Sequence, residues 1–141
     1  MEQESVENYL RIIYCLYEKE KDKTKGIKSI SIAKELRISK PSVSEMVKKL
    51  VKKGFVRANP YSRVFFTNKG MKKAKTIMHN YRVIEVFLKN VLDYNTNKLH
   101  EEAHRLEHAF SEESITRLDK FLNNAKIFSH GDITPRYDKI S

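Results

Sequence analysis

Two short helical patterns joined by a tight turn, and followed at once by a hairpin pattern, constrain the fold of this chain most strongly. Residues 30–36 and 39–54 place apolar side chains at helical spacing. Residues 55–58 and 63–66 are short β-type runs on either side of the turn-forming residues 59–62. A hairpin directly after two such helices is typical of a winged helix-turn-helix, which is a nucleic-acid-binding arrangement. Taken alone, the hairpin would fit an ordinary surface ribbon equally well.

Local signals mark the ends of these two helices. Ser29 is placed to cap the first helix, and Arg37–Ile38 turn the chain. Ser39 is placed to cap the second helix, and Pro41 suits its first turn because a missing N–H costs nothing there. Gly54 suits the end of the second helix.

Positive charge is concentrated in the same part of the chain. The formal net charge is +10, and residues 21–63 alone contain thirteen Lys or Arg and three Asp or Glu. That stretch therefore carries the whole excess of positive charge, and the remainder of the chain has a formal net charge of zero. A basic block beside a neutral remainder indicates that one domain contacts a polyanion and the other does not. Solvation by a lysine-rich surface is the alternative, but it does not explain the confinement to one segment.

The predicted second helix presents the side chains that would read DNA. Serine hydroxyls can donate to or accept from many bases, and Glu45 can accept from a cytosine amino group. Lysines and arginines would mostly hold phosphates. Because one such helix reads only a few base pairs, we expect a two-fold homodimer on palindromic double-stranded DNA. The candidate DNA-binding residues are Ser39, Lys40, Pro41, Ser42, Ser44, Glu45, Lys48, Lys49, Arg57 and Arg63.

The rest of the chain is predicted to be helical. Residues 18–28 are expected to form a charged loop, and residues 125–141 are expected to be irregular. The fold class is therefore mainly α. We expect an N-terminal winged helix-turn-helix over residues 1–70 and an all-helical domain over residues 71–141. The further expected helices span residues 4–19, 68–92, 96–110 and 112–124, with Ser111 capping the last and Ile115, Leu118, Phe121 and Leu122 pointing inward.

One face of the predicted helix 96–110 carries groups that bind metals. At about 100° per residue, His100, His104, Glu107, His108 and Ser111 fall on that face. Imidazoles at i and i+4 with a carboxylate beside them can close on one divalent ion without straining the backbone. A solvated polar face with scattered histidines is the alternative. Three of the five histidines of the chain lie here with an acid among them, which favours a metal site.

Several stretches resemble the two-domain, metal-dependent transcriptional regulators of the diphtheria-toxin-repressor and manganese-transport-regulator family. The resemblance implies a homodimer whose metal-loaded form binds operators of metal-uptake genes and represses them. It also implies a divalent metal, Fe(II) or Mn(II), and the short form of the family without an SH3-like third domain. The matching stretches are residues 7–16, 32–56, 67–70, 83–88, 99–113 (LHEEAHRLEHAFSEE) and 130–135 (HGDITP).

Carried over position by position, the resemblance implies a main metal site. Its ligands would be Asn8 from the first helix with His104, Glu107 and His108 from the late helix. At a neighbouring first-helix position, manganese-type members have an acid and this chain has Arg11, which argues against a binuclear manganese site.

The resemblance also implies a second metal site on the long helix. Glu85 and His100 match two of its ligands. The third position is Tyr81. An aromatic residue packed on the apolar side of the long helix is a simpler interpretation of Tyr81 than a metal ligand. His79, two residues earlier, is a candidate substitute.

Other features exclude several classes of protein. No apolar run is long enough to span a bilayer, the start is not a signal peptide, and a single cysteine, Cys15, permits no internal disulfide. We therefore expect a cytoplasmic protein without a membrane partner. Two rival functions stay open at this point: a winged-helix regulator that ignores metal and senses an organic ligand or nothing, and a small metal hydrolase with Glu107 or Glu85 as base. A hydrolase would need a substrate cleft, and its activity would not explain the winged helix. We therefore expect that the protein is not an enzyme.

Overall fold

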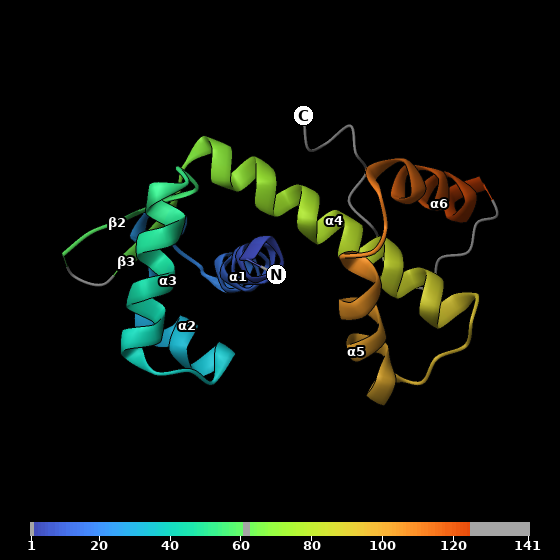
Figure 1. Ribbon diagram of the computed structural model, residues 1–141, viewed down its shortest axis with the longest axis horizontal. Helices are drawn as coiled ribbons and strands as arrows, with labels where there is room; N and C mark the ends of the chain where they lie inside the picture. Colours follow the sequence, from blue (N-terminus) through green and yellow to red (C-terminus); the bar gives the residue numbers. More distant parts are fainter. Residues whose placement is uncertain (1, 61–62, 125–141) are drawn as a thin grey trace. The chain divides into compact units, whose positions relative to one another are not determined.

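The computed structural model describes residues 2–60 and 63–124, and these residues are mainly helical (Figure 1). Contacts divide the chain into two compact units, residues 1–77 and 78–141, with the division inside α4. No helix in the described ranges combines the length and the apolar character needed to cross a membrane. The elements are α1 (Glu2–Lys19), the 3-10 helix η1 (Lys23–Lys25), β1 (Ile27–Lys28), α2 (Ser29–Leu36), α3 (Lys40–Lys52), β2 (Val56–Ala58), β3 (Arg63–Phe66), α4 (Asn68–Asn90), α5 (Thr96–Glu107) and α6 (Glu112–Asn124).

The first unit is a winged helix-turn-helix, as the sequence predicts. Its sheet has the order β1-β3-β2, and both strand pairs are antiparallel. Residues 18–28, expected as a loop, include η1 and β1, and Ile27 of β1 pairs with Val64 of β3. A two-residue strand is too short to produce an alternating pattern, which explains why the sequence did not indicate it.

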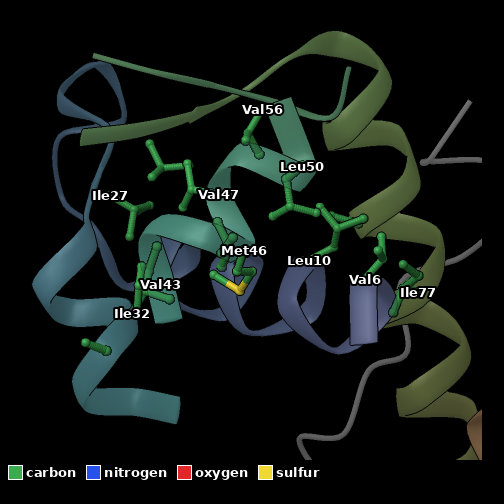
Figure 2. Close-up of a cluster of buried hydrophobic side chains, with 14 residues drawn as sticks. Val6, Leu10, Ile27, Ile32, Val43, Met46, Val47, Leu50, Val56 and Ile77 are labelled. Atoms are coloured by element: carbon green, nitrogen blue, oxygen red, sulfur yellow. The ribbon is translucent and has the colours of Figure 1, made fainter. Parts of the chain in front are cut away.

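A single apolar core holds α1, α2, α3, the sheet and the start of α4 together (Figure 2). Leu10 and Ile13 of α1, Ile32 of α2 and Leu50 of α3 have no exposed surface. Each of these helices buries one stripe, and α3 does so with Val43, Met46, Val47 and Leu50. Burial of this face fixes which side of α3 remains outside, and that outer side carries the predicted DNA-binding residues.

The turn between α2 and α3 has the expected local structure. Arg37 adopts the left-handed conformation (φ 55°) and donates its N–H to carbonyls of α2. The Ser39 hydroxyl accepts a hydrogen bond from the Ser42 N–H at 3.3 Å, and Pro41 lies in the first turn of α3. The predicted cap of α2 is wrong: Ser29 is the first helical residue, and Lys28 stands at the cap position without a side-chain hydrogen bond.

The end of α3 is joined closely to the start of α4. The Thr67 hydroxyl donates to the carbonyl oxygens of Gly54 (2.6 Å) and Phe55 (3.1 Å), and it accepts from the Gly70 N–H at 3.0 Å. Gly54 has φ 81°, which glycine adopts readily. A Cβ added at Gly70 would lie 1.7 Å from the Phe55 carbonyl oxygen. The first turn of α4 therefore rests directly on the backbone that follows α3.

Replacing Gly70 with alanine is expected to destabilise the protein by about 2 kcal/mol or more. A backbone atom must move to admit the methyl group, and overpacking of this kind outweighs the better helix propensity of alanine. Urea unfolding of Gly70→Ala against the wild type measures this difference in the free energy of unfolding. Lys75→Ala in the same helix serves as the control, and equal stability of the two variants would contradict the close contact described.

The second unit contains the later part of α4 together with α5 and α6. Tyr81, Ile84 and Leu88 of α4 pack with Leu99 and Ala103 of α5. Leu99 and Ala103 are therefore the residues that hold α5 against α4. The helix itself ends at Glu107, three residues before the expected end, and His108 is its C-cap residue.

The last helix begins as predicted, but its inner face differs from the expected one. The Ser111 hydroxyl accepts a hydrogen bond from the Ser114 N–H at 3.1 Å. Ile115 and Leu122 are buried, and Leu118 packs against Val83, Val86 and Leu122. Phe121 is 54% exposed, so its predicted inward position is wrong. Leu122 fills the space against α4, and the adjacent position on a helix points about 100° away.

Candidate metal centre and nucleic-acid interface

Three predicted metal ligands meet at the C-terminal end of α5. Glu107 Oε1 lies 3.3 Å from His104 Nδ1 and 3.4 Å from His108 Nε2. The centroids of the two imidazole rings are 5.2 Å apart, and the rings are nearly perpendicular. One ligand atom from each residue lies within 4.8 Å of the others. Within residues 2–60 and 63–124, no other group of three or more His, Cys, Asp or Glu side chains lies close enough together to hold one metal ion.

The surroundings of this centre suit a divalent cation. Glu107 is almost fully buried and His108 nearly so, whereas His104 is half exposed, so the group is both sheltered and open on one side. The C-terminal end of a helix carries partial negative charge, which favours a bound cation. Two imidazole nitrogens and a carboxylate oxygen, without sulfur, are ligands that suit Fe(II), Mn(II), Co(II) or Zn(II). The residues present therefore fit a divalent transition metal.

Asn8, the fourth predicted ligand, lies on α1 in the first unit. Its amide oxygen Oδ1 is buried and accepts no hydrogen bond from the described part of the chain. Buried acceptors are normally satisfied, and leaving one unsatisfied costs about 1–3 kcal/mol.

The residues predicted for a second metal site are only partly brought together. Glu85 Oε2 lies 3.5 Å from His100 Nδ1, and the Tyr81 hydroxyl is within hydrogen-bonding distance of the same nitrogen, at 3.1 Å. Tyr81 is also buried in the packing between α4 and α5. A neutral phenol is a weak metal ligand because its pKa is ordinarily about 10. The Glu85–His100 pair thus exists, with Tyr81 at the third position.

His79 has a different partner. Its side chain has no exposed surface, and its Nε2 lies 3.1 Å from Asp119 Oδ2 on α6. Within the described ranges, His79 does not join Glu85 and His100 in a group that could hold one ion. Asp119 was missed by sequence reasoning because an acid forty residues away on another helix leaves no local pattern.

The outer side of α3 and the wing enclose a basic hollow of about 760 Å³. Five predicted DNA-binding residues line it: Lys40, Pro41, Ser44, Lys48 and Arg63. Sequence reasoning missed five further residues that line the hollow: Lys28, Ser29, Ile30, Ala58 and Asn59. Lys28, Ser29 and Ile30 line it because β1 pairs with β3 and brings the start of α2 beside the wing, and a two-residue strand leaves no signal in the sequence.

Two neighbouring cations line this hollow side by side. Lys28 of β1 and Arg63 of β3 are partners in the strand register. Like charges at paired positions of a sheet repel each other and destabilise the sheet, and a bound anion between them removes this repulsion. The hollow therefore has the charge and the position to receive a phosphate group of a nucleic acid.

The other predicted DNA-binding residues lie around the hollow. Ser42, Glu45 and Lys49 line a second open hollow between α1 and α3, on the other flank of α3. Ser39 caps α3 at the end where the two hollows meet at Pro41. Arg57 of β2 is exposed and lies 5.9 Å from the centroid of the Phe65 ring. Nine of the ten candidates thus lie on or cap α3 or line one of the two hollows, and Arg57 lies on the hairpin outside both hollows.

Two family models match consecutive parts of the chain. The N-terminal DNA-binding domain of the iron dependent repressor matches residues 1–64, and the metal-binding and dimerisation domain of the iron dependent repressor matches residues 67–136. The chain is 38% identical over 123 residues to an HTH-type transcriptional regulator of Methanocaldococcus jannaschii, and the match covers 87% of this chain and 96% of the relative.

Longer relatives match as well. The iron-dependent repressor IdeR of Mycobacterium leprae is 33% identical over 134 residues, which is 94% of this chain and 56% of IdeR. The solved structure of the manganese regulator SloR is 41% identical with a TM-score of 0.76, and the match covers 94% of this chain and 60% of SloR. The chain therefore spans somewhat more than half the length of these two proteins.

Proposed function

The chain belongs to the iron-dependent repressor family, and from that premise we propose that it is a metal-dependent transcriptional repressor. The observation that carries the proposal is the presence of two different sites in one chain: a basic hollow on a winged helix, and a His–Glu–His centre on a helical unit. Neither site alone would distinguish a metal-responsive regulator from an ordinary DNA-binding or metal-binding domain.

The metal centre is the regulatory site in this proposal. His104, Glu107 and His108 hold the ion, and Asn8 is the further ligand that the resemblance to the family implies. The ion supplies positive charge and bonds to these side chains, and Fe(II) or Mn(II) fits the mixed nitrogen and oxygen ligands. The Glu85–His100 pair is a second, weaker position, whereas His79 is committed to Asp119.

The surface formed by α3 and the wing binds the operator in this proposal. Ser42, Ser44 and Glu45 face base edges in a major groove, and the lysines and arginines around them hold phosphates. Because α3 presents few side chains to the bases, a homodimer on a palindromic operator supplies the remaining specificity.

Metal binding and DNA binding are coupled in this account. A metal that favours the DNA-binding form by about 1.4 kcal/mol raises operator affinity tenfold. The repressor is a cytoplasmic protein that acts on genes for metal uptake. When the metal is plentiful, the metal-loaded repressor therefore stops further import of that metal. No catalytic role is assigned to the centre, since its expected effect is on DNA affinity.

A titration of the full chain with fluorescent duplex from upstream of its own gene tests this function. We expect Mn(II), or Fe(II) under anaerobic conditions, to raise affinity at least tenfold over the metal-free protein, with no such gain on unrelated duplex. Equal operator affinity with and without either metal would reject the metal-dependent repressor. It would favour a winged-helix regulator that responds to another ligand or to none.

A further inference from the structure

A row of exposed lysines continues past the DNA-binding residues assigned above. Residues 46–84 contain eleven Lys or Arg and no Asp or Glu. Lys52 and Lys53 end α3, and Lys69, Lys72 and Lys73 lie in the first two turns of α4. We call these five exposed residues the lysine ridge. None of their ammonium groups pairs with a carboxylate within the described residues.

The junction of the two helices makes this a single surface. Lys69 Nζ donates a hydrogen bond to the Lys53 carbonyl oxygen at 3.0 Å and lies 5.0 Å from the centroid of the Phe55 ring. Lys69, Lys72 and Lys73 are at positions i, i+3 and i+4, so they share one face of α4. Lys69 directs that face toward the end of α3, where Lys52 and Lys53 lie.

The lysine ridge is continuous with the proposed DNA interface. Lys48 and Lys49 line the hollows on the two flanks of α3, and Lys52 follows them one turn later. The N-terminal end of α4 adds its partial positive charge at the far end of the row. Positive charge therefore runs from Lys48 in the middle of α3 to the second turn of α4, and no acid lies in the sequence between these points.

We propose that the lysine ridge binds backbone phosphates of the same DNA duplex, outside the base pairs read by α3; this inference rests on the proposed function. Duplex DNA carries one negative charge per about 1.7 Å of its length, which suits a row of cations with no acid among them. An acidic protein would also need several apolar side chains at the centre of its contact, and Val51 is the only large apolar side chain of α3 that is exposed. Contacts of this kind hold DNA of any sequence and strengthen binding without changing specificity.

The salt dependence of DNA binding tests the lysine ridge. We would measure operator affinity of the full chain with Mn(II) over roughly 0.05–0.3 M salt, where the slope of log K against log [salt] counts phosphate contacts. For Lys72→Gln/Lys73→Gln we expect the slope to fall by about 1.8 in magnitude and the affinity to fall on the order of tenfold. The loss should be equal on operator and unrelated duplex. Lys72→Arg/Lys73→Arg keeps the charge and should keep the wild-type slope.

Matched variants distinguish phosphate binding by the lysine ridge from a general effect of charge and from loss of folding. Lys98→Gln/Lys120→Gln removes the same charge from exposed positions of α5 and α6 and should leave the slope unchanged. Single variants Lys72→Gln and Lys73→Gln, each expected to lower the slope by about 0.9, replace the double variant if its helical circular dichroism is lost. A wild-type slope in folded glutamine variants overturns the lysine ridge and points to another partner for it. If the wild type itself shows no metal-dependent preference for the operator, the proposed function fails instead.

Discussion

Glu107→Gln is expected to weaken Mn(II) binding on the order of 100-fold or more, and to abolish the gain in operator affinity that the metal provides. Glu107 supplies the carboxylate between the two imidazoles, at 3.3 Å from His104 and 3.4 Å from His108. The amide keeps the shape but removes the negative charge that holds a divalent ion. Competition with a fluorescent chelator measures the metal affinity, and fluorescence anisotropy of labelled operator measures the DNA affinity.

Glu101→Gln is the matched control for this variant. It makes the same change on the same helix, at an exposed residue whose carboxylate pairs with Arg105 at 3.0 Å. We expect Glu101→Gln to bind Mn(II) and operator as the wild type does. A Glu107→Gln protein that still responds to Mn(II) would show that the regulatory ion binds elsewhere.

Ser44→Glu is expected to reduce operator affinity on the order of 100-fold while leaving Mn(II) binding unchanged. Ser44 lines the basic hollow, one helical turn from both Lys40 and Lys48. A glutamate there would pair with these lysines and repel the phosphates that they hold. Operator titration in saturating Mn(II) measures the DNA affinity, and chelator competition measures the metal affinity.

Thr116→Glu, which adds a charge at an exposed position of α6, is the control for Ser44→Glu. It should bind operator with wild-type affinity. If Ser44→Glu also bound operator as the wild type does, the hollow between α3 and the wing would not be the DNA-binding surface.

The helix-turn-helix could be predicted from the sequence because its signals are local. The cap at Ser39, the proline at Pro41 and the glycine at Gly54 each mark a helix end through the conformation of one residue or a hydrogen bond within one turn. The helical spacing of the histidines likewise places His104 and His108 together, even though α5 ends at Glu107. A C-cap residue in the right-handed conformation keeps the direction of the helix for one more position.

Features that depend on distant partners could not be predicted. β1 exists because Ile27 pairs with Val64, and the pairing of His79 with Asp119 depends on how α6 packs on α4. The exposure of Phe121 was also set by tertiary packing, since helical periodicity alone allows a range of inward positions. The lysine ridge was not apparent for the same reason, because hydrogen bonds between the ends of α3 and α4 bring its two halves together.

The central claim is that one divalent ion at the His104–Glu107–His108 centre and operator DNA favour the same form of the protein. Binding equilibria are reciprocal, so operator duplex must raise Mn(II) affinity by the factor by which Mn(II) raises operator affinity. The most direct measurement is the Mn(II) dissociation constant of the full chain with and without saturating operator duplex. We predict at least tenfold tighter Mn(II) binding with the operator present, and an unchanged Mn(II) dissociation constant on DNA-bound protein would contradict the account.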